Sequence, residues 1–258
     1  MKGHEHIADT LRVTRRHGRV PLVAFLTAGY PSKAGFADDL KTVCAHADVV
    51  EIGVPFTDPM ADGVTIQRSS EAALAAGVSL SWIIDQLRAI DPRPVTPLLL
   101  MSYLNPLLAY GLNRLATDAA EAGVSGFIVP DLPFDESDDF RASMQRQGLA
   151  LVQLVTPVTP EDRLRRVCSA STGFVYAVTV AGITGGGSAL PADMYEYLDR
   201  VKSVSPVPVC AGFGIRSAEQ VSAIGNHADG VIVGSALVET MERGESVGGF
   251  LDSLRPEP

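Results

Sequence analysis

The chain has 258 residues, of which 46% are hydrophobic and 20% are charged, and its formal net charge at pH 7 is −9. This balance predicts a soluble globular protein with a sizeable core. The acidic charge and the scattered Lys and Arg residues argue against nucleic-acid binding, which needs clustered positive charge. No apolar run approaches the roughly 18 residues of a membrane span, and the charged stretch Met1–Arg19 lacks the apolar segment of a signal peptide.

Eight short apolar runs follow one another along the chain. Several are apolar throughout, which is typical of parallel strands that are buried on both faces. The predicted strands are Val20–Thr27, Asp48–Val54, Thr96–Tyr103, Gly126–Val129, Leu149–Val155, Phe174–Val178, Val207–Gly212 and Gly230–Val233.

The segments between these runs have apolar residues at intervals of three and four, which predicts amphipathic helices. Boundary residues agree, because Pro160 opens one helix and Gly123 and Gly148 follow the last turns of two others. The predicted helices are Lys33–Ala45, Leu112–Ala122, Glu136–Gln147, Pro160–Cys168 and Ser217–Ile224, with additional helical segments at Glu5–His17 and Thr65–Ile90.

Strands that alternate with helices indicate a parallel sheet built from βαβ units. A doubly wound open sheet is one possible arrangement, but eight strands in 258 residues favour a closed (β/α)8 barrel, the TIM barrel. The additional helices are then one N-terminal helix and one or more helices after the second strand. Because no linker or low-complexity tract divides the chain, residues 1–258 are predicted to form a single domain.

The catalytic groups of such barrels lie at the carboxyl ends of the strands. Glu51 is a carboxylate within an apolar strand, where burial raises the pKa and suits a general acid–base, although a structural hydrogen-bond network would also explain it. Asp62 follows in a loop rich in Gly and Pro, where it could instead cap a helix. Together the two residues predict acid–base chemistry by carboxylates.

Glycine-rich turns follow three of the later strands, at Gly182–Gly187, Ala211–Arg216 and Gly234–Ala236. Glycine lets backbone N–H groups approach an anion closely, and a helix N-terminus or a serine hydroxyl adds further donors. Any one of these turns could be a simple tight turn. Their convergence at one end of a barrel predicts a phosphorylated ligand.

Other kinds of chemistry lack the residues that they need. A Schiff-base enzyme needs a lysine at a strand end, and a metal enzyme favours clustered histidines and carboxylates. The lysines (Lys2, Lys33, Lys41 and Lys202) and the histidines (His4, His6, His17, His46 and His227) all fall elsewhere. The cysteines Cys44, Cys168 and Cys210 lack CxxC spacing and are predicted to be reduced thiols of a cytoplasmic protein.

The segment Glu51–Gly63, Glu-Ile-Gly-Val-Pro-Phe-Thr-Asp-Pro-Met-Ala-Asp-Gly, resembles the signature of the tryptophan synthase alpha chain family. The resemblance extends from Pro21 to Leu237, and so many ordered matches are highly specific. Further matching segments are Phe25–Pro31, Met101–Pro106, Val129–Pro133, Tyr176, Ala181–Gly185, Gly212–Ile215 and Gly234–Ala236.

The resemblance implies a lyase that cleaves indole-3-glycerol phosphate into indole and glyceraldehyde 3-phosphate by a retro-aldol reaction. It implies that Glu51 is the acid–base and that Asp62 accepts the indole N–H and stabilises positive charge on the ring nitrogen. Tyr176 would orient Glu51. The implied indole-binding residues are Phe25, Leu100, Ile128, Leu154, Thr184 and Phe213, and the implied phosphate-binding residues are Gly185, Gly214, Gly234 and Ser235.

The family also implies a partner. An alpha chain of this kind has no cofactor or metal of its own and pairs with a beta chain that holds pyridoxal phosphate, in an αββα complex. Indole then passes to the beta chain for tryptophan synthesis. Pro55 and Asp58 match positions that face the beta chain.

Three positions depart from the family pattern. Val64 replaces a usual proline, Val180 replaces a residue that is often polar, and the glycine-rich stretch Gly185–Leu190 is short. Since added glycine raises the entropy lost on ordering a loop, we expect weak activity alone and a strong dependence on the partner. The alternatives are a stand-alone lyase, a sugar-phosphate isomerase or epimerase on the same barrel, and a weakly catalytic subunit that activates its partner.

Overall fold

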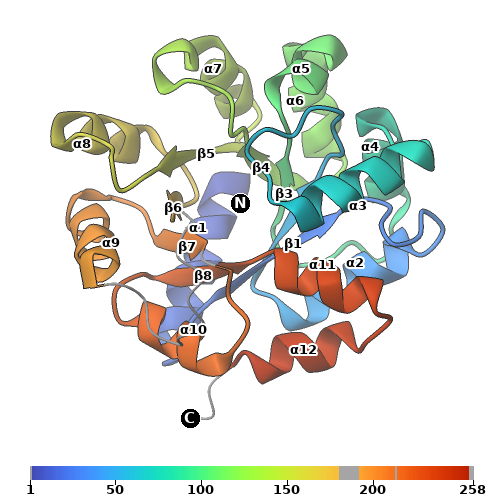
Figure 1. The fold of residues 1–258 in the computed structure, drawn as a ribbon. Coiled ribbons are helices and arrows are strands. Elements are labelled where there is room, and N and C mark those ends of the chain that lie inside the picture. The colour runs from blue at the N-terminus through green and yellow to red at the C-terminus, as the bar shows by residue number, and fades with distance from the viewer. Residues whose placement is uncertain (1, 180–191, 213, 256–258) are drawn as a thin grey trace.

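The computed structural model describes residues 2–179, 192–212 and 214–255. Eight parallel strands close into a barrel in chain order, and β8 pairs with β1. The helices form a ring around it (Figure 1), so the predicted TIM barrel is confirmed. The strands are β1 (Leu22–Thr27), β2 (Val49–Gly53), β3 (Leu98–Met101), β4 (Val124–Ile128), β5 (Ala150–Val155), β6 (Val175–Val178), β7 (Val209–Gly212) and β8 (Gly230–Val233).

The helices agree with the predicted ones to within a few residues, and the additional segments are α1 at the N-terminus and α3 with α4 after β2. Four helices were not predicted: α5, α9, α11 and α12. For α5 and α12 the reason is their length, since seven residues are too few to reveal an apolar period. None of the helices in the described ranges is long and apolar enough to cross a bilayer. The helices are α1 (Gly3–Arg16), α2 (Phe36–His46), α3 (Val64–Ala75), α4 (Leu80–Ala89), α5 (Leu104–Tyr110), α6 (Leu112–Glu121), the 3-10 turn η1 (Phe134–Glu136), α7 (Asp138–Arg146), α8 (Glu161–Ala170), α9 (Ala192–Val204), α10 (Ala218–Gly225), α11 (Ser235–Glu242) and α12 (Val247–Ser253).

Two apolar layers result from the alternation of side chains along each strand. On β3, for example, Leu98 and Leu100 belong to the large cluster between the barrel and its helices, whereas Leu99 belongs to the cluster that fills the barrel interior. The interior cluster is small because alternate residues of short strands are its main source. It comprises Ile7, Leu11, Val23, Val49, Leu99, Ile128, Ala150, Val152, Phe174, Cys210 and Ile232.

Helix α1 closes the amino-terminal end of the barrel. Its residues Ile7 and Leu11 are fully buried within the interior cluster, although they precede the first strand in the chain. The start of the helix is joined to the start of β5, since the His4 amide donates to the Gly148 carbonyl over 3.2 Å. With this end closed, the barrel interior is accessible from the carboxyl end.

Truncation of Leu11 tests this closure. We expect Leu11→Ala to lower the free energy of unfolding by about 2–5 kcal/mol, because it leaves a void between α1 and the strands. Val13→Ala is the matched control on the same helix, since Val13 is 45% exposed, and we expect a change within about 0.5 kcal/mol. Urea unfolding followed by circular dichroism measures both variants, and equal losses would contradict the closing role.

Candidate active site

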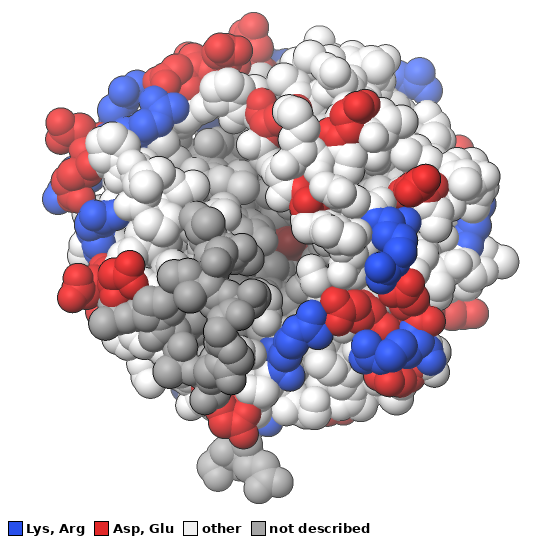
Figure 2. Space-filling model, viewed as in Figure 1, with Lys and Arg blue, Asp and Glu red and all other residues white. Residues whose placement is uncertain are grey.

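A cavity of about 230 Å³ opens at the carboxyl ends of the strands. Figure 2 shows this face hollowed near its centre, with charged residues spread around the periphery. Each of the eight strands, or the segment that follows it, contributes to the wall of the cavity. The described lining residues are Phe25, Glu51, Ala61, Asp62, Gly63, Ile66, Met101, Pro130, Leu154, Tyr176, Val178, Thr179, Gly212, Gly214, Ile232, Gly234 and Ser235.

Glu51 lies on β2 between Phe25 of β1 and Leu99 of β3, and its side chain faces the barrel interior. The residue is fully buried, and neither carboxyl oxygen has a hydrogen-bond partner among the described residues. A structural hydrogen-bond network therefore does not explain it there. Burial raises the pKa of Glu51 to about 8, so at neutral pH the carboxyl group holds a proton that it can donate.

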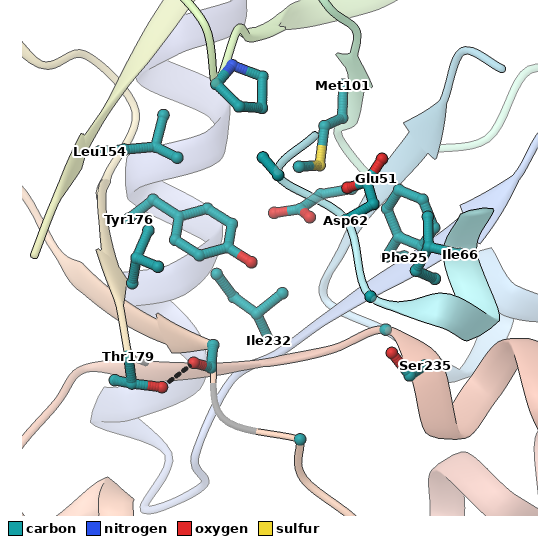
Figure 3. Close-up of a pocket in the computed structure, with 17 residues that line it drawn as sticks. Phe25, Glu51, Asp62, Ile66, Met101, Leu154, Tyr176, Thr179, Ile232 and Ser235 are labelled. Carbon is teal, nitrogen blue, oxygen red and sulfur yellow. Dashed lines mark hydrogen bonds between the residues drawn. The ribbon is translucent and has the colours of Figure 1, made fainter. Parts of the chain in front are cut away.

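Asp62 lies in the loop between β2 and α3 and lines the same cavity, where Figure 3 shows it beside Glu51. It does not cap α3, since Gly63 occupies the N-cap and no side chain caps the helix. Burial raises the pKa of Asp62 to about 6, and a hydrogen bond from Tyr103 opposes the rise. Between about pH 6 and pH 8 the cavity therefore holds one ionised and one protonated carboxyl group.

Tyr103, at the N-cap of α5, holds the Asp62 loop in place. Its hydroxyl oxygen accepts the Ala61 amide at 2.9 Å, and its ring stacks on Phe56 with 5.0 Å between centroids. These two contacts fix the loop on both sides of its exposed residues. In the sequence, Tyr103 stood out only as part of Met101–Pro106, a segment that resembles the family. Its role at Asp62 was not predicted, because no local pattern connects a tyrosine after β3 with a carboxylate after β2.

Tyr176 projects from β6 into the cavity, with its hydroxyl directed toward the two carboxyl groups (Figure 3). Burial, followed by the charges of Glu51 and Asp62, raises its pKa well above the usual value, so the hydroxyl stays protonated. Gly212 makes room for this ring, because a Cβ there would lie 2.7 Å from the Tyr176 hydroxyl oxygen. Gly53 does the same for Phe25, at 2.4 Å.

The predicted indole-binding residues are only partly brought together. Phe25 and Leu154 line the cavity, whereas Ile128 belongs to the interior cluster and does not line it. The prediction for Leu100 was wrong: this side chain packs between β3 and the helices, and Met101 lines the cavity instead. Thr184 and Phe213 lie outside the described residues. The sequence missed Ile66, Pro130, Val178, Thr179 and Ile232, which complete the wall.

The predicted phosphate-binding residues lie at one side of the cavity. Gly214 has a φ of +63°, and Gly234 is the N-cap of α11, whose first residue is Ser235. The free N–H groups of a helix N-terminus suit an anion. Among the described lining residues none is Lys or Arg, so backbone groups and Ser235 would bind a phosphate. Gly185 lies outside the described residues.

Arg216, which follows Gly214, is already paired with Glu239 of α11 at 2.7 and 3.1 Å. The same carboxylate accepts the Thr65 hydroxyl of α3 at 3.1 Å. Glu239 thus joins the loop after β7 to the helix that follows Asp62. The described residues contain no group of three or more His, Cys, Asp or Glu side chains that could hold a metal ion.

Of the two residues predicted to face a partner, Asp58 is exposed and Pro55 is buried within this chain. Of these two residues, only Asp58 has a side chain at the protein surface. Exposed apolar side chains lie near it, since Met60 is 88% and Val64 is 76% exposed.

The closed barrel and the cavity at its carboxyl end define an α/β-barrel of the class that places its catalytic groups in the loops after the strands. A family model described as tryptophan synthase alpha chain matches residues 11–248. Tryptophan synthase alpha chains from Nitratidesulfovibrio vulgaris strain DP4 and Geobacter sulfurreducens are 43% and 44% identical. The alignments cover 93% and 96% of this chain and 94% and 97% of the relatives.

Solved structures agree. The tryptophan synthase alpha subunit of Legionella pneumophila has a TM-score of 0.88 at 32% identity, covering 98% of this chain and 97% of the other. A tryptophan synthase chain of Mycobacterium tuberculosis has a TM-score of 0.88 at 35% identity, covering 97% and 98%. The chain belongs to the tryptophan synthase alpha chain family, and it is a lyase of tryptophan biosynthesis.

Removal of the Tyr103 hydroxyl tests its role at Asp62. In Tyr103→Phe the stack on Phe56 remains, but the hydrogen bond that lowers the pKa of Asp62 is lost. The Asp62 pKa should rise, so the acidic limb of the kcat/KM profile should move to higher pH by about one unit.

The matched control is Tyr110→Phe, which removes a hydroxyl that donates to Asp118 on the outer helices at 2.6 Å. Its pH profile should be unchanged. A Tyr103→Phe enzyme with a lower rate but an unshifted limb would show that the hydroxyl acts only on loop stability.

Proposed function

We propose that the cavity cleaves indole-3-glycerol phosphate into indole and glyceraldehyde 3-phosphate. The observation that carries the proposal is the pairing of Glu51 and Asp62 in one apolar cavity, with burial raising the pKa of each to a different value. Two carboxyl groups with separated pKa values can act as an acid and as a fixed anion at the same pH. The lining offers apolar surface for an indole ring and glycine turns for a phosphate.

The reaction begins with a proton that Glu51 holds at neutral pH. Glu51 donates this proton to C3 of the indole ring, which creates positive charge on the ring nitrogen. Asp62 accepts the N–H and stabilises that charge, and it does so strongly because the cavity is apolar and the carboxylate is already in place.

Glu51 is then a carboxylate, and it takes the proton of the glycerol hydroxyl next to the bond that breaks. The hydroxyl oxygen forms the aldehyde carbonyl, the carbon–carbon bond cleaves, and its electron pair returns to the ring and neutralises the nitrogen. One proton leaves Glu51 and one returns, so the residue ends as it began. We propose that Tyr176, which stays protonated, keeps the Glu51 carboxyl directed at the ring.

The remaining side chains hold the substrate. Phe25, Met101 and Leu154 contact the ring in the proposed complex, and the backbone at Gly214 and Gly234 with the Ser235 hydroxyl binds the phosphate. Figure 3 shows Phe25, Met101, Leu154 and Ser235 around the carboxyl pair. A substrate bound at both ends is fixed relative to Glu51, and such positioning lowers the entropic part of the barrier.

We further propose that the chain works in an αββα complex with a beta chain that holds pyridoxal phosphate, in the cytoplasm. The exposed Asp58 and the apolar Met60 and Val64 support a docking surface around the cavity, since large exposed apolar side chains mark interaction sites when they gather. Val158, 86% exposed in the loop after β5, adds to the same end of the barrel. The three cysteines are free thiols, which fits a reducing compartment.

Release of glyceraldehyde 3-phosphate from indole-3-glycerol phosphate, with and without a beta chain, tests the function. We expect product release that increases when the beta chain is added. Glu51→Gln should lower kcat by about 10²–10⁴-fold, because its amide cannot exchange the proton. Glu71→Gln, an exposed change on α3, is the control and should retain the wild-type rate.

Equal turnover with and without the beta chain would favour a stand-alone lyase. A phosphopentose that is turned over instead would favour an isomerase or epimerase. If the chain does not cleave indole-3-glycerol phosphate but increases the activity of the beta chain, the result would favour a subunit that only activates its partner.

The pH profile of kcat/KM provides a second test. Asp62 must be ionised and Glu51 protonated in the free enzyme, so the rate should fall below about pH 6 and above about pH 8. In Asp62→Asn the acidic limb should disappear and kcat should drop by about 10²–10³-fold. A profile that rises continuously through pH 9 would mean that Glu51 starts as a base, contrary to the proposed order of proton transfers.

A further inference from the structure

A second cavity, of about 190 Å³, lies in the barrel wall beside the main one. It exists because the pairing of β4 with β5 ends at Ile128 and Val152, whereas β5 continues to Val155. Gln153 and Leu154 therefore have no partner on β4, and the two strands leave a gap between them. The 3-10 turn η1 and helix α8 cover this gap from outside through Phe134 and Val167. We call this space the side cavity.

Gln153 is the unusual residue of the side cavity. Its neighbours on the same face of β5, Leu151 and Val155, pack in the apolar layer against the helices. Gln153 is only 6% exposed, and its backbone amide donates to the Ser171 hydroxyl at 2.9 Å. Its side-chain amide forms no hydrogen bond within the described ranges, yet it lines the side cavity. The amide faces the cavity without a partner among the described residues, so its donor and acceptor are available to a ligand.

The other polar side chains of the wall are already engaged. Arg163 donates to Asp135 at 2.5 Å, and the Thr159 hydroxyl accepts the Thr156 amide at 3.0 Å. The rest of the lining is apolar apart from backbone groups. The side cavity thus combines apolar side chains and polar backbone groups with one unpaired side-chain amide, and a few polar groups among apolar side chains are typical of a small-molecule site.

We propose that the side cavity binds a small planar amide, of the size of a single-ring aromatic carboxamide. A dry cavity of roughly 150 Å³ admits benzene, so 190 Å³ holds one ring with a small substituent. The Gln153 Nε2 donates to the ligand carbonyl, while the ligand N–H donates to Gln153 Oε1. This reciprocal pair uses both groups that the chain leaves unpaired. Since Pro130 and Leu154 line both cavities, the ligand also contacts the wall of the main one.

Benzamide is the probe, and methyl and side-chain amide NMR of the full chain separates the two cavities. Of these two cavities, Val129 and Val167 line the side cavity alone, whereas Ile66 and Ile232 line the main one alone. We expect benzamide to shift the Val129 and Val167 methyl signals and the Gln153 side-chain amide signal in one saturable process. Toluene, which has the ring without the amide, should leave the Gln153 amide signal in place.

Gln153→Met removes both hydrogen-bonding groups while keeping a side chain of similar length. The affinity for benzamide should fall by about tenfold or more, because two hydrogen bonds are lost. Gln147→Met, an exposed change of the same type, should bind benzamide as the wild type does. Shifts confined to Ile66 and Ile232, no shift at all, or an unchanged affinity in Gln153→Met would each overturn the proposal. Because these readouts need no turnover, they stand apart from the proposed lyase activity.

Discussion

The burial of the Glu51 carboxyl group inside the barrel is the constraint on which the rest of the site depends. The pKa of this carboxyl group is about 4.5 in the unfolded chain, and burial raises it to about 8 in the folded chain. The folded chain therefore holds a proton that the unfolded chain lacks between these values, so this group lowers stability as pH rises through the interval. A barrel with a large apolar core can bear such a group. The same burial supplies the proton that the proposed chemistry needs.

Several features keep this carboxyl group both buried and reachable. Helix α1 closes the amino-terminal end with Ile7 and Leu11, and the cavity that Glu51 lines opens at the carboxyl end. Gly53 and Gly212 lack the Cβ atoms that would collide with Phe25 and Tyr176, so two rings can stand beside the carboxyl groups. The shape of the cavity therefore depends on the absence of side chains at Gly53 and Gly212 as well as on the side chains that line it. A methyl group at either glycine would collide with one of these rings and change the shape of the cavity.

Much of the fold and the acidic pair could be predicted from the sequence because each depends on local pattern. Continuous apolar runs indicate parallel strands, and Glu51 is conspicuous as a charge within one of them. Whether each side chain of a strand faces the barrel interior or the surrounding helices could not be predicted in this way. Leu98–Met101 is apolar throughout, so its sequence does not distinguish side chains that face the barrel interior from those that face the helices. For this reason Leu100 was predicted to line the cavity, whereas Met101 lines it. Tyr103 was missed for another reason, since its contact with the Asp62 loop joins segments 42 residues apart.

Loops at the carboxyl end are joined to one another by polar contacts, and these contacts bear on how the site could respond to a ligand. Glu239 joins Arg216, close to the proposed phosphate-binding residue Gly214, to Thr65, three residues after Asp62. Such exposed contacts contribute little to stability singly. They link the two ends of the proposed substrate site, however, so an anion that repositions the Gly214 loop also acts on the helix behind Asp62. The barrel holds Glu51 on β2, and Tyr103 holds the loop that carries Asp62, so both carboxyl groups are in place before a ligand binds.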